Sequence, residues 1–441
     1  MAASSGQPDC ALLNVHAYPG QCRNATTASA TTRNHKKIEV SLCPAPPPLP
    51  SKLYVHCPEL RLTVLPRVIS AVEDLFLLRV AVDCRPDASS WPEDSDYFIY
   101  RAGGGGTESP SLQRLARLHP FFHDDDVGVL GRGANYTVAV LMGTGTPVYD
   151  LHILHSENPT EWIYHMVSVT EPPRRFPLLI PENCGRLLYH ETSTIISIGG
   201  EAGTMGWVDL WHGILLCDVL RDEPTLRGVP MPIPLELVCC DNGQGTELGC
   251  PIPFRGIAFV KLGCGDTPHD CLKLVHLAPK ASLLPAVDNE TGSLNFQMHD
   301  WTIITYTNTA MTSSWNRKDW HRDCWLRASD FTVDTQVNSD LLQSGLLGSS
   351  SGQGLQNLLV SHPATAISSA SASGKGVVYL MARKKYRHPE LWALALDTRK
   401  KKLLGVAEFG TERQPGPPVA MYFPSSIAKY IKPDTDTDTG V

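Results

Sequence analysis

The sequence predicts an all-β fold, an irregular β-propeller of six blades between disordered N- and C-terminal tails. Glycine and proline number 35 each among 441 residues, which favours many turns over long helices. Short apolar runs, each ended by turn residues, recur from Lys52 to about Tyr430. A propeller holds so many short strands in one domain without leaving long edges exposed.

The C-terminal part has the clearest strand pattern. Val377–Arg383 (VVYLMAR) and Leu391–Asp397 (LWALALD) are apolar runs, and Lys402–Phe409 (KLLGVAEF) follows the charged turn Thr398–Lys401. Runs joined by short polar turns predict an antiparallel meander. Because side chains alternate along a strand, the middle run has two apolar faces and is expected to be buried on both. One face carries Trp392, Leu394 and Leu396, and the other carries Leu391, Ala393 and Ala395.

Similar runs recur upstream and define the remaining units of the predicted propeller. They are Asp96–Tyr100, Tyr136–Met142 with Val148–Leu154, Gly206–Trp211 with Ile214–Leu220, Ile257–Leu262 with Leu272–Leu277, and Trp301–Thr307 with Trp325–Val333. One strand of each of six units is marked by Tyr97, Tyr149, Trp207, Leu272, Trp325 and Trp392. Their mean spacing of about 59 residues exceeds the ~40–50 residues of regular propeller repeats. Two β-sandwich domains divided near Arg174–Pro181 are the alternative.

The composition divides the chain into three parts. Residues 1–51, rich in Ala, Ser and Thr and ending in the proline-rich Cys43–Pro50, are expected to be a disordered tail. Residues 52–431 form the propeller-like domain, and the polar residues 432–441 form a second tail.

Charge, hydropathy and cysteine content exclude several classes of protein. The net charge of −7 argues against nucleic-acid binding, which depends on clustered Lys and Arg. No apolar run approaches the ~20 residues of a membrane helix. The 13 cysteines, an odd number without a regular framework, indicate reduced thiols inside the cell, in the cytoplasm or nucleus. An organelle transit peptide at the N-terminus remains an alternative.

A loop rich in tryptophan and basic residues is the predicted partner-binding surface. It contains Trp315, Arg317, Lys318, Trp320 and Arg322. Trp and Arg are enriched at the energetic centres of interfaces. The alternative is core packing, with Trp325 in a core strand and Trp315 covering the loop.

Two groups of residues were considered as metal ligands. The first is a soft-ligand cluster of Cys239, Cys250, Cys264, His269 and Cys271. It lacks the closely paired ligands of structural zinc sites, and buried apolar cysteines are the alternative. The second is the pair His119 and His123 before Asp124–Asp126. Pro120 opposes the helix that would join the two imidazoles, so a loop with solvated acids is favoured. We predict no cofactor.

The phrase Gly206–Leu220 (GWVDLWHGILLCDVL) resembles the signature of a plant family of unknown function, domain-of-unknown-function family 1618, which is expanded in grasses. Supporting phrases are Tyr54–Pro58, Asp74–Val80, Asp96–Ala102, Val377–Met381, Leu391–Asp397 and Ile427–Tyr430. The family has no assigned activity or catalytic residues. Many of its relatives resemble the propeller-like substrate-binding regions of F-box proteins, but residues 1–50 lack the Leu-Pro-led helical segment of an F-box.

The favoured function is a non-enzymatic interaction module. Its loops and channel mouth would bind a protein or peptide partner, because propellers present variable loops on a rigid scaffold. A hydrolase or metal-dependent enzyme with a His/Asp/Cys site at the channel mouth is the alternative function.

Overall fold

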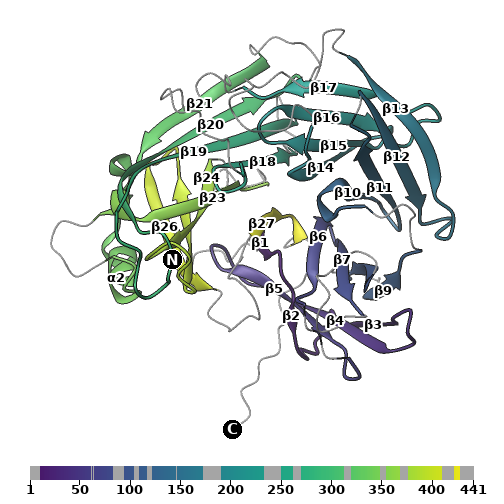
Figure 1. Ribbon diagram of the computed structural model, residues 1–441, viewed down its shortest axis with the longest axis horizontal. Coiled ribbons are helices and arrows are strands. Elements are labelled where there is room, and N and C mark those ends of the chain that lie inside the picture. The colour runs from purple at the N-terminus through teal and green to yellow at the C-terminus, as the bar shows by residue number, and fades with distance from the viewer. Residues whose placement is uncertain are drawn as a thin grey trace, which may run out of the picture.

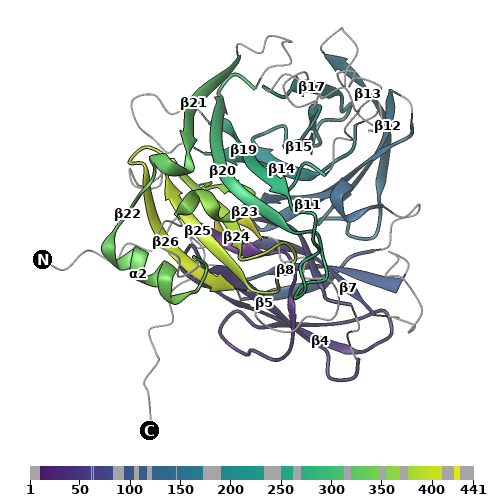
Figure 2. The same ribbon diagram turned by 60° about the vertical axis from the view of Figure 1, so that its left-hand side comes forward.

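The structure is a computed structural model that describes residues 10–60, 62, 64–82, 94–103, 109–116, 122–145, 147–171, 190–232, 250–261, 270–311, 319–347, 354–367, 376–409 and 422–427. Strands dominate this part of the chain, and its one α-helix is α2 (Thr335–Gln343). Figure 2 shows α2 beside strand β26 (Lys402–Phe409), with which it is in contact. The prediction of an all-β fold is confirmed.

Within the described residues, five antiparallel meanders of four strands follow one another along the chain. The first contains β6 (Arg67–Val72), β7 (Leu75–Ala81), β8 (Ser95–Arg101) and β9 (Ser111–Arg114). The second contains β10 (Val127–Arg132), β11 (Asn135–Gly143), β12 (Val148–His155) and β13 (Ile163–Glu171). The third contains β14 (Thr194–Gly199), β15 (Thr204–Asp209), β16 (Gly213–Asp218) and β17 (Leu226–Pro230). The fourth contains β18 (Arg255–Val260), β19 (Cys271–Leu283), β20 (Phe296–Asn308) and β21 (Trp320–Arg327). The fifth contains β23 (Leu359–Thr365), β24 (Val377–Arg383), β25 (Leu391–Asp397) and β26.

Two further pairings involve the outer strands of these meanders. Strands β13 and β17 pair in parallel, which joins the second and third meanders into one eight-stranded sheet. The short β22 (Thr332–Val333) pairs in parallel with β26. The segment near Arg174–Pro181, where the two-sandwich alternative divides the chain, lies outside the described residues.

The two ends of the described chain build one more sheet, which we call the closing sheet. Its strand order is β27-β1-β5-β4-β3, and β2 also pairs with β5. The C-terminal β27 pairs antiparallel with the N-terminal β1, from Ala11↔Ser425 to Asn14↔Tyr422. The strands are β1 (Ala11–Asn14), β2 (Tyr18–Pro19), β3 (Ala28–Thr31), β4 (Lys37–Cys43), β5 (Pro50–His56) and β27 (Tyr422–Ser425).

The closing sheet corrects the prediction that residues 1–51 are a disordered tail. Strands β1 to β5 begin at Ala11 and bury Leu12, Leu13, Ile38 and Leu53 completely. Burial against a distant strand overrides a composition that resembles a linker. Residues 1–9 of the predicted N-terminal tail and the predicted tail at residues 432–441 lie outside the described residues.

Six buried apolar clusters connect these sheets into a ring (Figure 1). Each cluster takes side chains from two neighbouring meanders, or from the closing sheet and a meander beside it. Leu77 of the first meander packs with Val138 of the second, for example, and Leu12 of the closing sheet packs with Ala393 of the fifth meander. The remaining clusters connect the second to the third, the third to the fourth, the fourth to the fifth and the closing sheet to the first. The fold is therefore propeller-like.

The strand markers predicted from sequence agree only partly with this ring. The C-terminal meander is confirmed, because β24, β25 and β26 have the predicted bounds and the two faces of β25 lie in two different clusters. Leu272 and Trp325, however, were assigned to different units and both lie in the fourth meander. The unit that those markers omitted is the closing sheet.

Candidate functional site

A cavity of about 360 Å³ lies at the centre of the ring. The strands β6, β14, β18, β23 and β27 line it, together with Asp124, Asp125 and Val127 where β10 begins. Each of these strands pairs along one edge only within its sheet. The other edge of β6 is bonded at its start to residues 15–17, through the bridge His16↔Arg67 and the hydrogen bond from the Val68 N–H to the Val15 carbonyl. Unpaired strand edges carry backbone N–H and C=O groups that can bind an extended peptide. The cavity therefore combines these backbone groups with the side chains of its walls.

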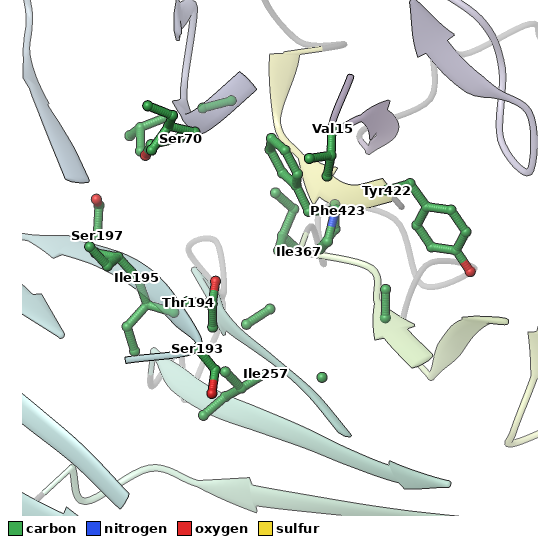
Figure 3. Close-up of a pocket in the computed structure, with 18 of the residues that line it drawn as sticks. Val15, Ser70, Ser193, Thr194, Ile195, Ser197, Ile257, Ile367, Tyr422 and Phe423 are labelled. Atoms are coloured by element: carbon green, nitrogen blue, oxygen red, sulfur yellow. The ribbon is translucent and has the colours of Figure 1, made fainter. Parts of the chain in front are cut away.

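The cavity walls are apolar with a few hydroxyl groups. Figure 3 shows Ile195 and Ile257 on one side and Val15, Ile367 and Phe423 on the other. The serine and threonine hydroxyls belong to Ser70, Ser193, Thr194, Ser197 and Ser426, and Arg255 and His362 add ionisable side chains to the lining. Such a pocket, mostly apolar with few polar groups, is typical of binding sites.

Two wall residues of the cavity are fixed by contacts outside it. Ser197 Oγ donates a hydrogen bond to the carbonyl oxygen of Val129, 2.7 Å away on the neighbouring β10. Tyr422 packs its ring into the cluster between the fifth meander and the closing sheet. These contacts hold β14 and β27 in place beside the cavity.

An ion-pair network forms one rim of the cavity. Arg67 contacts Asp125 at 2.9 Å and Asp124 at 3.3 Å, and Arg79 contacts Asp124 at 3.2 Å. Tyr97 donates a hydrogen bond to Asp124 at 3.4 Å. Asp124 is only 7% exposed, whereas Asp125 is 47% exposed. We infer that Asp124 holds the rim together and that Asp125 is accessible to a ligand.

This network corrects the prediction that Asp124–Asp126 are solvated acids in a loop. The three residues form a short 3₁₀ helix directly before β10. Asp124 is buried in ion pairs, and burial raises the pKa of Asp126 to about 6. His119 lies outside the described residues, so the proposed pair with His123 is not tested.

The other rim carries a second, looser ion pair. Glu73 follows β6 and Lys261 follows β18, and their charged atoms are 4.0 Å apart. Both residues line the cavity. Charged groups of both signs therefore border an apolar interior at each end.

A buried Asp–His pair lies in the turn between β15 and β16. His212 Nδ1 and Asp209 Oδ2 are 2.6 Å apart, and both side chains are 0% exposed. Asp209 also accepts hydrogen bonds from the backbone N–H groups of Glu191, Trp211 and His212. Burial alone would raise the pKa of Asp209, but the hydrogen bond from His212, the nearby His190 and these N–H groups together hold it well below its usual range.

The Asp209–His212 pair resembles part of a hydrolase triad only in its spacing. In a triad the second histidine nitrogen faces a nucleophile. Nε2 of His212 has no hydrogen-bond partner among the described residues, and neither side chain lines the cavity. The pair holds a turn in place and gives no support to the hydrolase alternative.

The predicted tryptophan-rich surface is only partly described. Trp315, Arg317 and Lys318 lie outside the described residues. Arg322 is exposed on β21, as a contact residue should be. The prediction that Trp320 lies on a partner-binding surface is wrong. Trp320 is 7% exposed, packs between the third and fourth meanders, and donates its indole N–H to the Pro230 carbonyl at 3.0 Å.

The assignment of Trp325 to the core is also wrong. It is 46% exposed, and the Arg327 guanidinium lies 5.1 Å from the centre of its ring. Trp325, rather than Trp320, is therefore the aromatic residue that β21 presents to solvent.

The predicted soft-ligand cluster is also mostly outside the described residues, which omit Cys239, Cys264 and His269. Cys250 is exposed, whereas Cys271 is buried at the start of β19. Burial raises the pKa of the Cys271 thiol. Among the described residues no group of three or more Cys, His, Asp or Glu side chains is arranged to hold a metal ion.

The cavity residues were missed in the sequence because they come from strands far apart in the chain. Arg67 and Phe423, for example, are separated by most of the sequence. No local spacing connects them, and each belongs to an ordinary apolar run. A local signal is present in the acidic triplet Asp124–Asp126, for which the sequence favours solvated acids.

The fold and site define a propeller-like all-β domain with a central cavity. The family model described as "Protein of unknown function (DUF1618)" matches residues 207–368, from β15 to just past β23. The predicted resemblance to family 1618 is thus confirmed over this segment, which includes most of the phrase Gly206–Leu220. No curated protein matches the chain.

Solved structures show only weak similarity. The Trypanosoma rangeli sialidase in complex with the inhibitor DANA is 10% identical with a TM-score of 0.26, over 93% of this chain and 54% of that one. The chain therefore spans about half the length of that sialidase. The tail fibre of Staphylococcus aureus phage P68 is 8% identical with a TM-score of 0.15, over 91% and 96% of the two chains. In the described part of this chain no helix is long and apolar enough to cross a membrane.

Proposed function

We propose that this protein is a non-enzymatic binding module, a six-bladed β-propeller whose central cavity accepts an extended peptide segment of a partner protein. The observation that carries the proposal is the cavity of about 360 Å³, bordered by unpaired strand edges of several sheets. A volume of this size accommodates one or two apolar side chains rather than a folded domain.

The chemistry of the cavity favours a peptide whose apolar residues are flanked by charged ones. Ile195, Ile257 and Phe423 provide an apolar surface, and burial of an apolar side chain there is worth about 1.5–3 kcal/mol. At the rim, the 47% exposed Asp125 is available to a Lys or Arg of the ligand.

The alternative, an enzyme, has less support. Neither residue of the buried Asp209–His212 pair lines the cavity, although Leu210 between them does. The serine and threonine hydroxyls of the cavity belong to Ser70, Ser193, Thr194, Ser197 and Ser426, and a serine or threonine nucleophile requires an adjacent base. The histidine of the lining, His362, has its Nδ1 2.9 Å from the hydroxyl of Ser361, which does not line the cavity. The Ser197 hydroxyl donates its hydrogen bond to the backbone carbonyl of Val129 on β10, not to a base.

A peptide selection tests the proposal. The full chain would be used to select binders from a phage-displayed library of linear peptides, and their affinities would be measured by fluorescence anisotropy. Ser70→Phe fills the cavity from the middle of β6 and should weaken binding by about tenfold or more. Ser168→Phe makes the same change at an exposed position of β13 and should bind like the wild type.

Selected peptides that bind Ser70→Phe and wild type equally would contradict the cavity as the binding site. Failure to select any peptide would contradict peptide binding itself. Asp125→Asn adds a charge test, because the preference for basic peptides should decrease while the preference for apolar residues remains.

A further inference from the structure

Two half-buried thiols meet at the outer part of the closing sheet. Cys22 lies in the segment between β2 and β3, Cys43 is the last residue of β4, and their sulfur atoms are 2.6 Å apart. A covalent bond holds two sulfurs about 2.05 Å apart. The two side chains therefore already point at one another from segments that are 21 residues apart in the sequence.

Hydrogen bonds hold the Cys22 segment against β4. Asn24 donates from Nδ2 to the Leu42 carbonyl at 2.9 Å, and the Thr26 hydroxyl lies 3.1 Å from the same carbonyl. The Leu42 N–H in turn donates to Thr26 Oγ1 at 2.9 Å. On the other side of Cys22, the Gly20 N–H donates to the Val55 carbonyl at 3.1 Å. The two sulfurs are thus held together by structure on both sides of Cys22.

We propose that Cys22 and Cys43 form an intramolecular disulfide when the folded protein is oxidised by a peroxide. One thiolate attacks a peroxide oxygen and becomes a sulfenic acid, with release of water. The second sulfur then attacks the sulfenic sulfur, and a second water leaves. Two thiols and one hydrogen peroxide thereby give one disulfide and two waters, so the two thiols are oxidised and the peroxide is reduced.

The close contact of the two thiols allows the steps in either order. Burial and the contact with Cys22 raise the pKa of Cys43 to about 12. Whichever thiol is oxidised first, the sulfur of the other lies in contact with it and can attack the sulfenic sulfur as its thiolate.

Other described thiols are less suited to the reaction. Cys10, Cys57, Cys217 and Cys271 are buried, and Cys250 is exposed just before β18, far in the sequence from the cysteines of the closing sheet. Cys324 is half-buried on β21, and its sulfur lies 3.2 Å from the Thr305 hydroxyl. A disulfide requires two thiols that face each other. In the described part of the structure, Cys22 and Cys43 are such a pair.

The bond would fix the crossover of the closing sheet. Residues 20–27 connect β2, on one edge of β5, to β3, on the far edge of β4. A disulfide between Cys22 and Cys43 closes this crossover covalently and limits the freedom of the unfolded chain. The oxidised protein should therefore resist urea better than the reduced protein.

Peptide mapping of the folded chain tests the proposal. The reduced full-length protein is treated with hydrogen peroxide, alkylated without reduction and digested with trypsin. Cleavage after Arg23, Lys37 and Lys52 leaves Cys43 as the one cysteine of residues 38–52 and leaves Cys10 and Cys22 together in residues 1–23. We expect a cross-link between these two peptides and an increase in the urea midpoint.

Matched variants identify the residues. Cys22→Ser and Cys43→Ser should each abolish the cross-link and the peroxide-dependent increase in the urea midpoint. Cys10→Ser and Cys324→Ser should retain both. Recovery of alkylated Cys22 and Cys43 after peroxide treatment, or a cross-link that survives Cys22→Ser, would overturn the assignment. A cross-link that leaves the urea midpoint unchanged would overturn its role in fixing the crossover.

Discussion

A Cβ atom added to Gly256 would lie 1.9 Å from the carbonyl oxygen of Pro363. Strands β18 and β23 are therefore in backbone contact beside the central cavity, which both residues line. The contact is possible only because residue 256 has no side chain, and it connects the fourth meander to the fifth.

Gly256→Ala should therefore destabilise the protein by about 1–3 kcal/mol, because one of the two backbones must move. Gly143→Ala is the matched control, since nothing lies within 4 Å of the Cβ that this substitution adds, and it should change stability by less than about 0.5 kcal/mol. Urea unfolding measures both. If the two variants have equal stability, the close approach of β18 and β23 does not occur in solution.

The two tryptophans of β21 should respond very differently to substitution. Trp320→Phe removes a buried indole and its hydrogen bond to Pro230, which should cost about 1–3 kcal/mol. Trp325→Phe changes a residue that is 46% exposed, so the cost should be within about 0.5 kcal/mol. Thermal unfolding compares the two. A larger loss of stability for Trp325→Phe than for Trp320→Phe would mean that β21 buries Trp325 and exposes Trp320.

Three partly buried histidines predict a loss of stability in mild acid. Burial lowers the pKa of His190, His276 and His362 to about 4 each, against about 6.5 in an unfolded chain. Between these values the unfolded chain binds protons that the folded chain does not, so the free energy of unfolding falls as pH drops. Burial raises the pKa of Asp126 to about 6. Between this pH and the pKa of about 3.9 of an unfolded Asp, the folded chain binds the extra proton, so Asp126 increases the free energy of unfolding as pH drops.

Urea unfolding at about pH 7.5 and about pH 5 should show a net decrease of a few kcal/mol, at about 1.4 kcal/mol for each unit of pKa shift. His276→Gln should make this decrease smaller, because a neutral side chain replaces a titrating one. His321→Gln, at an exposed position of β21, is the control and should leave the decrease as it is. An increase in stability toward pH 5 would contradict the assignment of these histidines as partly buried and neutral.

The sequence was sufficient where both strands of a pair are neighbours in the chain. In β24, β25 and β26, apolar alternation and short charged turns define the strands, and the two faces of β25 enter different clusters as predicted. The information there is local, because each strand pairs with the next along the chain.

The sequence was insufficient where partners are distant. Strand β1 finds β27 more than 400 residues away, with Ala11 opposite Ser425. No local pattern in residues 11–14 indicates that they pair with β27, and their composition is that of a disordered tail. The cavity is hidden for the same reason, since residues such as Arg67 and Phe423 meet only when the ring closes.

Closure of the ring by the N-terminal segment can be tested at Leu12. This residue is fully buried, pairs with Pro424 of β27, and packs in the cluster shared with the fifth meander. Leu12→Ala should therefore cost about 2–5 kcal/mol. Leu404→Ala makes the same change at a residue of β26 that is 42% exposed, so it should cost far less. Urea unfolding compares them, and equal losses would mean that residues 11–14 are a tail after all. A large difference would instead show that β1 is paired with β27 in solution. Leu12 can be buried only while β27 and the fifth meander are in place.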